Sequence, residues 1–117
     1  MHNFRNLVIW QKAREIVKNT YTMTQKFPKE ELYGLTSQMR RASVSIISNI
    51  AEGSGKSSNK DFVRFLEMSL SSCFELESQI ILSHDMGYVT EEKSNEVCSF
   101  IQEEQKMIFN FIKTLKE

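Results

Sequence analysis

Apolar side chains recur at three- and four-residue steps along nearly all of this chain of 117 residues. That spacing places them on one face of an α-helix, whereas a half-buried strand would need strict alternation. The chain also has only one Pro and four Gly, so few positions can interrupt a helix. The pattern therefore predicts an all-α fold of long helices joined by short links.

Four helical segments are expected, and most of their ends carry a start or stop signal. Phe27-Pro28 ends the first, since proline disfavours the helical conformation in the residue before it. Gly53 suits a left-handed C-cap after the second segment, and Gly87 ends the third. Ser58 or Asn59 can cap the third segment, and Thr90 can cap the fourth. The predicted ranges are about 7–26, 32–52, 59–86 and 90–115.

Short links make consecutive helices antiparallel neighbours, so we predict an antiparallel up-down-up-down four-helix bundle. No repeat, linker or low-complexity tract suggests a second unit, and residues 1–117 are expected to form one domain. No segment is apolar for long enough to cross a membrane, and the N-terminal residues lack the apolar stretch of a signal peptide. We therefore expect a cytoplasmic protein with reduced cysteines.

The two cysteines are expected to be small buried or half-buried thiols. Cys73 and Cys98 lie on the third and fourth segments, whose hairpin is centred near Tyr88, and this register offsets them by about 9 Å. A disulfide needs Cα atoms within about 7 Å. A redox or metal role is the alternative.

No motif for catalysis or cofactor binding has the residue spacing that its chemistry requires. Gly53-Ser54-Gly55-Lys56-Ser57 looks like part of a phosphate-binding loop, but that motif follows a strand and needs a Gly where Ile50 stands. We interpret the run as an interhelical loop.

The remaining polar groups also lack partners at catalytic spacing. His84 has no second metal ligand one turn away, and His2 lies at the terminus. Glu75 and Glu77 point about 200° apart on a helix, so they cannot form a carboxylate pair. The sequence therefore predicts no catalytic residue, no metal and no cofactor, and we interpret the protein as a non-enzyme.

Charge is distributed unevenly although its sum is zero. Residues 1–58 carry nine basic and four acidic side chains, and residues 59–117 carry six basic and eleven acidic ones. The basic half can offer a positive surface to the phosphates of RNA or DNA. Alternatively, the two sides attract each other within or between chains, and Arg41 pairs internally with Glu52. The candidate nucleic-acid-binding residues are Lys12, Arg14, Lys18, Arg40 and Arg41.

A second apolar strip flanks the core stripe of the second segment. Val44, Ile47 and Ala51 fall about 80° to 140° from Met39 around the helix. We expect this strip to form a subunit interface of a homo-oligomer. The alternative is a broad contact with a partner helix of the same chain.

Residues 35–53 read Leu-Thr-Ser-Gln-Met-Arg-Arg-Ala-Ser-Val-Ser-Ile-Ile-Ser-Asn-Ile-Ala-Glu-Gly. This run resembles the four helix bundle protein family, also called the 23S ribosomal RNA intervening-sequence protein family. Its members show Leu-Thr-x-Gln-x-Arg-Arg-Ala and then Ser-Ile-x-x-Asn-Ile-Ala-Glu-Gly. One departure is Ser69-Leu70-Ser71-Ser72-Cys73, where the family usually has Ala-x-Gly-Ser-Leu. The other matches are Trp10-Gln11-Lys12-Ala13, Phe27-Pro28-Lys29-Glu30-Glu31, Phe65-Leu66, Glu75-Leu76-Glu77 and Gly87-Tyr88.

The resemblance implies a bacterial protein whose family has no established molecular function. The family is encoded in intervening sequences of 23S rRNA genes and elsewhere, so ribosomal-protein labels reflect gene location. Similar proteins include the accessory protein of diversity-generating retroelements, a basic pentamer that binds nucleic acid and a reverse transcriptase. The resemblance thus implies a pentamer that contacts RNA or DNA and brings no catalytic residues. The alternative function is a protein-interaction scaffold without nucleic-acid contact.

Overall fold

The computed structural model describes all 117 residues as four α-helices and two short 3-10 helices, without a strand. The all-α prediction is confirmed, and each predicted helix end lies within three residues of the observed one. None of the helices combines the length and apolarity needed to cross a membrane. The helices are α1 (Val8–Thr24), α2 (Leu35–Ser54), α3 (Asn59–Asp85) and α4 (Glu91–Lys116), with η1 (Phe4–Asn6) and η2 (Lys29–Glu31).

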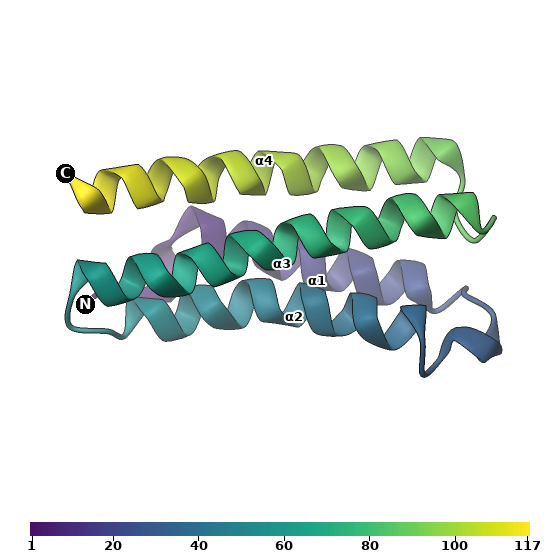
Figure 1. Ribbon diagram of the computed structural model, residues 1–117, viewed down its shortest axis with the longest axis horizontal. Coiled ribbons are helices and arrows are strands. Elements are labelled where there is room, and N and C mark those ends of the chain that lie inside the picture. Colours follow the sequence, from purple (N-terminus) through teal and green to yellow (C-terminus); the bar gives the residue numbers. More distant parts are fainter.

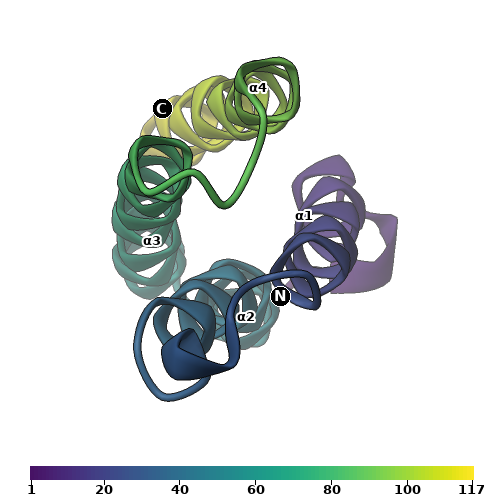
Figure 2. The same ribbon diagram turned by 90° about the vertical axis from the view of Figure 1, so that its right-hand side faces the viewer.

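The four helices lie side by side along the long axis (Figure 1). Viewed end on, they surround that axis in the order α1, α2, α3, α4 (Figure 2). Each helix packs against the next in the chain, and α4 also contacts α1. These contacts fit the expected up-down-up-down bundle.

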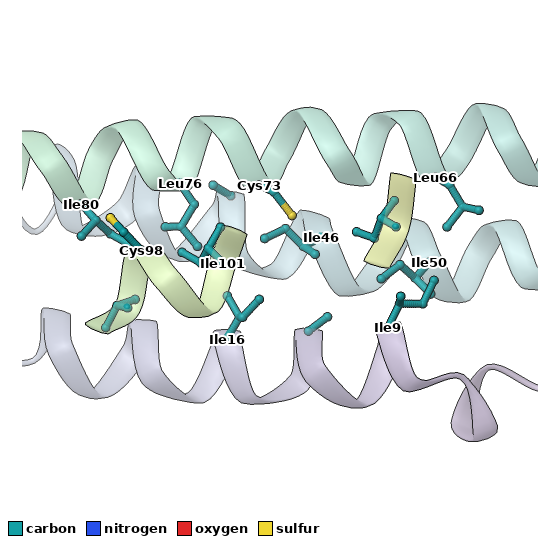
Figure 3. Close-up of a cluster of buried hydrophobic side chains, with 14 of the residues drawn as sticks. Ile9, Ile16, Ile46, Ile50, Leu66, Cys73, Leu76, Ile80, Cys98 and Ile101 are labelled. Atoms are coloured by element: carbon teal, nitrogen blue, oxygen red, sulfur yellow. The ribbon is translucent and has the colours of Figure 1, made fainter. Parts of the chain in front are cut away.

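A continuous apolar core fills the space between the helices (Figure 3). Its 21 buried residues come from all four helices and from Phe27 in the link after α1. Ile16, Ile46, Leu76 and Ile101 are almost fully buried within it. A fully buried aliphatic side chain contributes roughly 1.5–3 kcal/mol, so this core supplies the main stabilisation of the bundle.

Capping hydrogen bonds define the helix ends beside the α2–α3 and α3–α4 links. Ser58 accepts a hydrogen bond from the Asp61 N–H and Thr90 from the Lys93 N–H, both at 3.1 Å, so these two predicted caps are confirmed. After α3, the Tyr88 N–H donates to the Ser83 carbonyl at 2.9 Å. The intervening Gly87 has a φ of 81°, which makes this a Schellman motif and confirms the stop at that glycine.

The prediction for Gly53 was wrong. Helix α2 continues through Gly53 to Ser54, and Gly87 is the one residue with a positive φ. A Cβ at Gly53 would lie 2.8 Å from Phe62 Cδ1 and 2.8 Å from Phe65 Cβ. The glycine therefore permits α2 to pack closely against the Phe62 and Phe65 side chains of α3, because a Cβ there would clash with both.

Small polar residues also form hydrogen bonds across the α2–α3 contact. The Ser69 hydroxyl donates to the Ile46 carbonyl at 2.8 Å, and the Ser72 hydroxyl donates to the Ser45 hydroxyl at 2.9 Å. Ser71, where the family usually has Gly, is exposed. The departure from the family pattern therefore leaves the close packing of these helices intact.

Candidate nucleic-acid interface

Basic side chains of α1 and α2 meet on one face of the bundle. Arg14, Lys18 and Tyr21 are exposed and share a face of α1, since they recur every three to four residues. Arg40 of α2 reaches across to this face, with its guanidinium carbon 4.7 Å from the ring centroid of Tyr21. The structure therefore brings four of the five candidate residues, Arg14, Lys18, Arg40 and Arg41, to the α1–α2 side.

Arg40 is held in place from two sides. Its Nε donates to the Thr24 hydroxyl at 2.9 Å while its guanidinium lies over the Tyr21 ring. A guanidinium has five N–H donors, and only the one on Nε is used within the fold. The remaining donors are oriented in advance, so binding a phosphate there costs less side-chain entropy.

An open groove of about 610 Å³ adjoins Arg40 at the end of the bundle that carries η2 (Figure 1, right). We call it the tyrosine–arginine groove. None of its lining side chains is acidic, and Tyr33 is 92% exposed at its edge. The groove therefore combines cationic groups with aromatic surface. Its lining residues are Tyr21, Leu32, Tyr33, Thr36, Ser37, Arg40, Arg41 and Val44.

Arg41 is exposed and takes part in none of the four ion pairs of the structure. The alternative in which Arg41 pairs with Glu52 is therefore wrong. Glu75 of α3 borders a cleft on the other side of Arg41 without forming an ion pair with it, so the guanidinium donors are available to a ligand. Arg41 is the most accessible cation of the tyrosine–arginine groove.

Lys12 lies elsewhere and is already occupied. Its ammonium group is 2.9 Å from a Glu103 carboxylate oxygen and 3.7 Å from the ring centroid of Phe100, so it lies on the side of α1 that faces α4. Only 15% of its side chain is exposed. Lys18, by contrast, pairs with Glu15 at 3.4 Å on the surface, where such a pair contributes little and is easily exchanged.

The apolar strip of α2 is divided between the core and the surface. Ile47 is half-buried and packs against the core, whereas Val44 is 38% exposed and lines the tyrosine–arginine groove. Ala51 is half-buried. Contact within the chain accounts for Ile47, and the predicted subunit interface rests on Val44 and on the exposed parts of its two neighbours.

Two residues that are prominent in the structure were not identified from the sequence. Tyr33 lies in the link before α2, and its signal was a large aromatic residue where polar link residues are usual. Glu104 is fully buried, and neither carboxylate oxygen has a hydrogen-bond partner. Burial raises the pKa of Glu104 to about 8, against a smaller lowering by Lys12.

The cysteines are both free and buried, as expected. Burial raises the pKa of each thiol above its ordinary value, and the nearby carboxylate of Glu104 adds to the shift at Cys73. Both therefore stay in the unreactive thiol form. No group of three or more His, Cys, Asp and Glu side chains is arranged to hold a metal ion.

Comparison with known proteins places this fold in a family. The model of the family described as 23S rRNA-intervening sequence protein matches residues 5–110. The chain belongs to that family. The match includes α1, α2, α3 and all of the tyrosine–arginine groove, and it confirms the resemblance drawn from residues 35–53.

A crystal structure from this group supports the same conclusion. It is a protein of unknown function from the S23 ribosomal protein family of Bacteroides thetaiotaomicron, with 25% identity and a TM-score of 0.80. The similarity covers 91% of this chain and 99% of that chain. No curated protein matches the sequence. The comparisons thus establish family and fold, and the similarity to the retroelement accessory protein stays a prediction.

Proposed function

We propose that this protein is a non-enzymatic nucleic-acid-binding protein that contacts RNA or DNA through the α1–α2 face. The observation that carries the proposal is the tyrosine–arginine groove, in which two arginines and exposed tyrosines lie together without an acidic side chain. Arginine binds phosphate through charge-assisted, bidentate hydrogen bonds. Arg14 and Lys18 extend the positive surface along α1.

The fold separates the basic and acidic halves of the sequence in space. The basic half of the chain forms α1 and α2, and the acidic half forms α3 and α4. These pairs occupy opposite sides of the bundle (Figure 2). A phosphate backbone is therefore attracted to α1–α2 and repelled from α3–α4, so a chain of zero net charge can still bind in one orientation.

The protein is also proposed to act as a homo-oligomer in the cytoplasm. Val44 leaves apolar surface exposed next to Ile47 and Ala51, and burial of that surface by a second copy would favour association. The number five comes from the resemblance to pentameric relatives. Several copies in one closed ring would multiply the phosphate contacts made with one nucleic acid.

The second candidate function is a protein-interaction scaffold. Leu32 and Tyr33 are exposed together in the tyrosine–arginine groove, and such residues also occur in protein–protein interfaces. In that case the arginines would pair with acidic side chains of the partner. The two functions differ in their response to RNA.

Titration of a labelled RNA with the purified protein at several salt concentrations tests the proposal. Each phosphate contact contributes roughly 0.7–0.9 to the slope of log affinity against log salt concentration. We expect Arg41→Ala to reduce that slope by about one unit and to weaken binding regardless of base sequence. We expect a similar loss for the double variant Arg14→Ala/Lys18→Ala.

Lys106→Ala is the matched control, because Lys106 is an exposed cation on α4, outside the proposed face. It should leave the salt slope unchanged. Equal effects of Lys106→Ala and Arg41→Ala would mean that binding follows total charge only. Absence of measurable RNA or DNA binding at low salt would refute the proposal and favour the scaffold.

A further inference from the structure

Tyr33 presents an almost fully exposed aromatic ring on a hydrogen-bonded stretch of backbone. It lies between η2 and α2, where the Glu31 carboxylate accepts hydrogen bonds from the Leu35 N–H at 3.1 Å and from the Tyr88 hydroxyl at 2.9 Å. The Gly34 N–H donates to the Glu31 carbonyl at 3.0 Å. These contacts fix the backbone on both sides of Tyr33 while its side chain remains in solvent. Because the backbone is already held, a ligand that stacks on the ring has only the two side-chain torsions of Tyr33 to order.

The surroundings of Tyr33 define a ligand that is both flat and anionic. Leu32, Tyr21 and Val44 are each partly exposed in the same groove, and Arg40 and Arg41 supply two cations. The guanidinium carbon of Arg40 already lies over the Tyr21 ring, 4.7 Å from its centroid. Purely anionic ligands would leave the apolar surface uncovered, and purely apolar ligands would leave the guanidinium groups without partners.

Unpaired nucleotides satisfy both requirements. Proteins bind single strands by stacking bases on aromatic side chains while cationic groups follow the backbone. In a duplex the base faces are stacked on one another, so only phosphates and groove edges are accessible. A duplex could therefore use Arg40 and Arg41 but would gain nothing from Tyr33.

We infer that the tyrosine–arginine groove binds single-stranded nucleic acid, with an unpaired base stacked on Tyr33 and adjacent phosphates held by Arg40 and Arg41. The inference rests on the proposed function and specifies its ligand. The groove has a volume of about 610 Å³, which lies within the range of about 300–1,000 Å³ that is common for binding sites of small organic molecules. Each copy of the chain therefore has room for a short stretch of strand, and neighbouring phosphates can continue towards Lys18 and Arg14.

The test compares one strand in two states by fluorescence anisotropy. The probes are a labelled oligouridine of about 12 nucleotides, within the usual site size of about 4–16, and the same strand annealed to oligoadenosine. We expect tighter binding of the single strand. Tyr33→Ala should weaken that binding about tenfold and leave the salt slope unchanged, because stacking contributes affinity without neutralising phosphates. Tyr33→Phe should retain the affinity.

Phe109→Ala is the matched control, since Phe109 is an exposed aromatic residue on α4. It should bind the single strand as the parent protein does. Equal affinity for both probes, together with full binding by Tyr33→Ala and a loss in Arg41→Ala, would overturn the stacking inference while the proposed function stands. Failure of the parent protein to bind either probe would overturn both.

Discussion

Glu104 provides the sharpest test of the energetics of this fold. It is the only Asp, Glu, Lys or Arg that the bundle buries, and neither of its carboxylate oxygens has a hydrogen-bond partner. Burial raises the pKa of Glu104 to about 8 because a carboxylate loses its hydration there. Lys12 opposes the shift only weakly, and its ammonium is engaged with Glu103 and the ring of Phe100.

The sign of the pH effect follows from the two pKa values. In the unfolded chain Glu104 titrates at the ordinary pKa of 4.5, and in the folded chain it titrates at about 8. Between these values the folded protein holds a proton that the unfolded chain has released, so the free energy of unfolding falls as pH rises. At about 1.4 kcal/mol per pH unit, the loss at pH 7 relative to pH 4 is roughly 3 kcal/mol. Above pH 8 the loss is complete.

We therefore expect Glu104→Leu to stabilise the protein. Leucine has a similar volume, favours helix, and removes both the ionisation penalty and the unpartnered oxygens. The gain in unfolding free energy should be roughly 3 kcal/mol at pH 7 and larger at pH 9. Glu104→Gln should remove the pH dependence and gain less, since its amide also lacks partners.

Urea denaturation followed by circular dichroism at pH 4, 7 and 9 measures these differences. Protein concentration must be constant, because subunit association would add to the apparent stability. Glu96→Gln is the matched control, as this carboxylate of the same helix is exposed and its ion pair with Lys93 contributes about 1 kcal/mol or less. The reasoning is refuted if Glu104→Leu and the parent protein lose stability in parallel between pH 4 and pH 9.

Three further predictions concern packing and the thiols. Gly53→Ala should destabilise by about 1–3 kcal/mol in denaturant unfolding, because the new Cβ meets Phe62 and Phe65 at 2.8 Å. Gly87→Ala should cost about 1–2 kcal/mol through its φ of 81°, although its Cβ meets no neighbour. A thiol reagent should modify Cys73 at pH 8 only after denaturant is added, and rapid reaction in the folded protein would contradict its burial.

The sequence was sufficient for the helices because their signals are local. The three-and-four spacing, the caps at Ser58 and Thr90 and the stop at Gly87 each depend on residues within one or two turns. Gly53 shows where local reasoning fails. A glycine near a helix end is equally compatible with a left-handed turn and with close helix packing, and Phe62 and Phe65 decide between them only in the folded bundle.

The candidate site was only partly predictable for the same reason. The five basic residues were visible in the sequence, but separating Lys12 from Arg40 required the facing residues on α4 and α1. Glu104 continues the apolar stripe of α4 between Ile101 and Ile108, so its spacing indicated burial while its charge indicated the surface. Spacing prevailed because the apolar neighbours on both sides fix the orientation of the helix.

The proposed nucleic-acid binding and the proposed assembly share one residue, Val44. This residue lines the tyrosine–arginine groove and also begins the apolar strip that ends at Ala51, about 10 Å further along α2. Association through the strip would place a second copy beside the groove, so that one strand could contact both. A charge at Val44 would disturb groove and strip together, whereas Ala51 does not line the groove. Ala51→Glu should therefore lower the mass measured by light scattering and weaken RNA binding in parallel. Loss of assembly with unchanged RNA affinity would show instead that each groove acts alone.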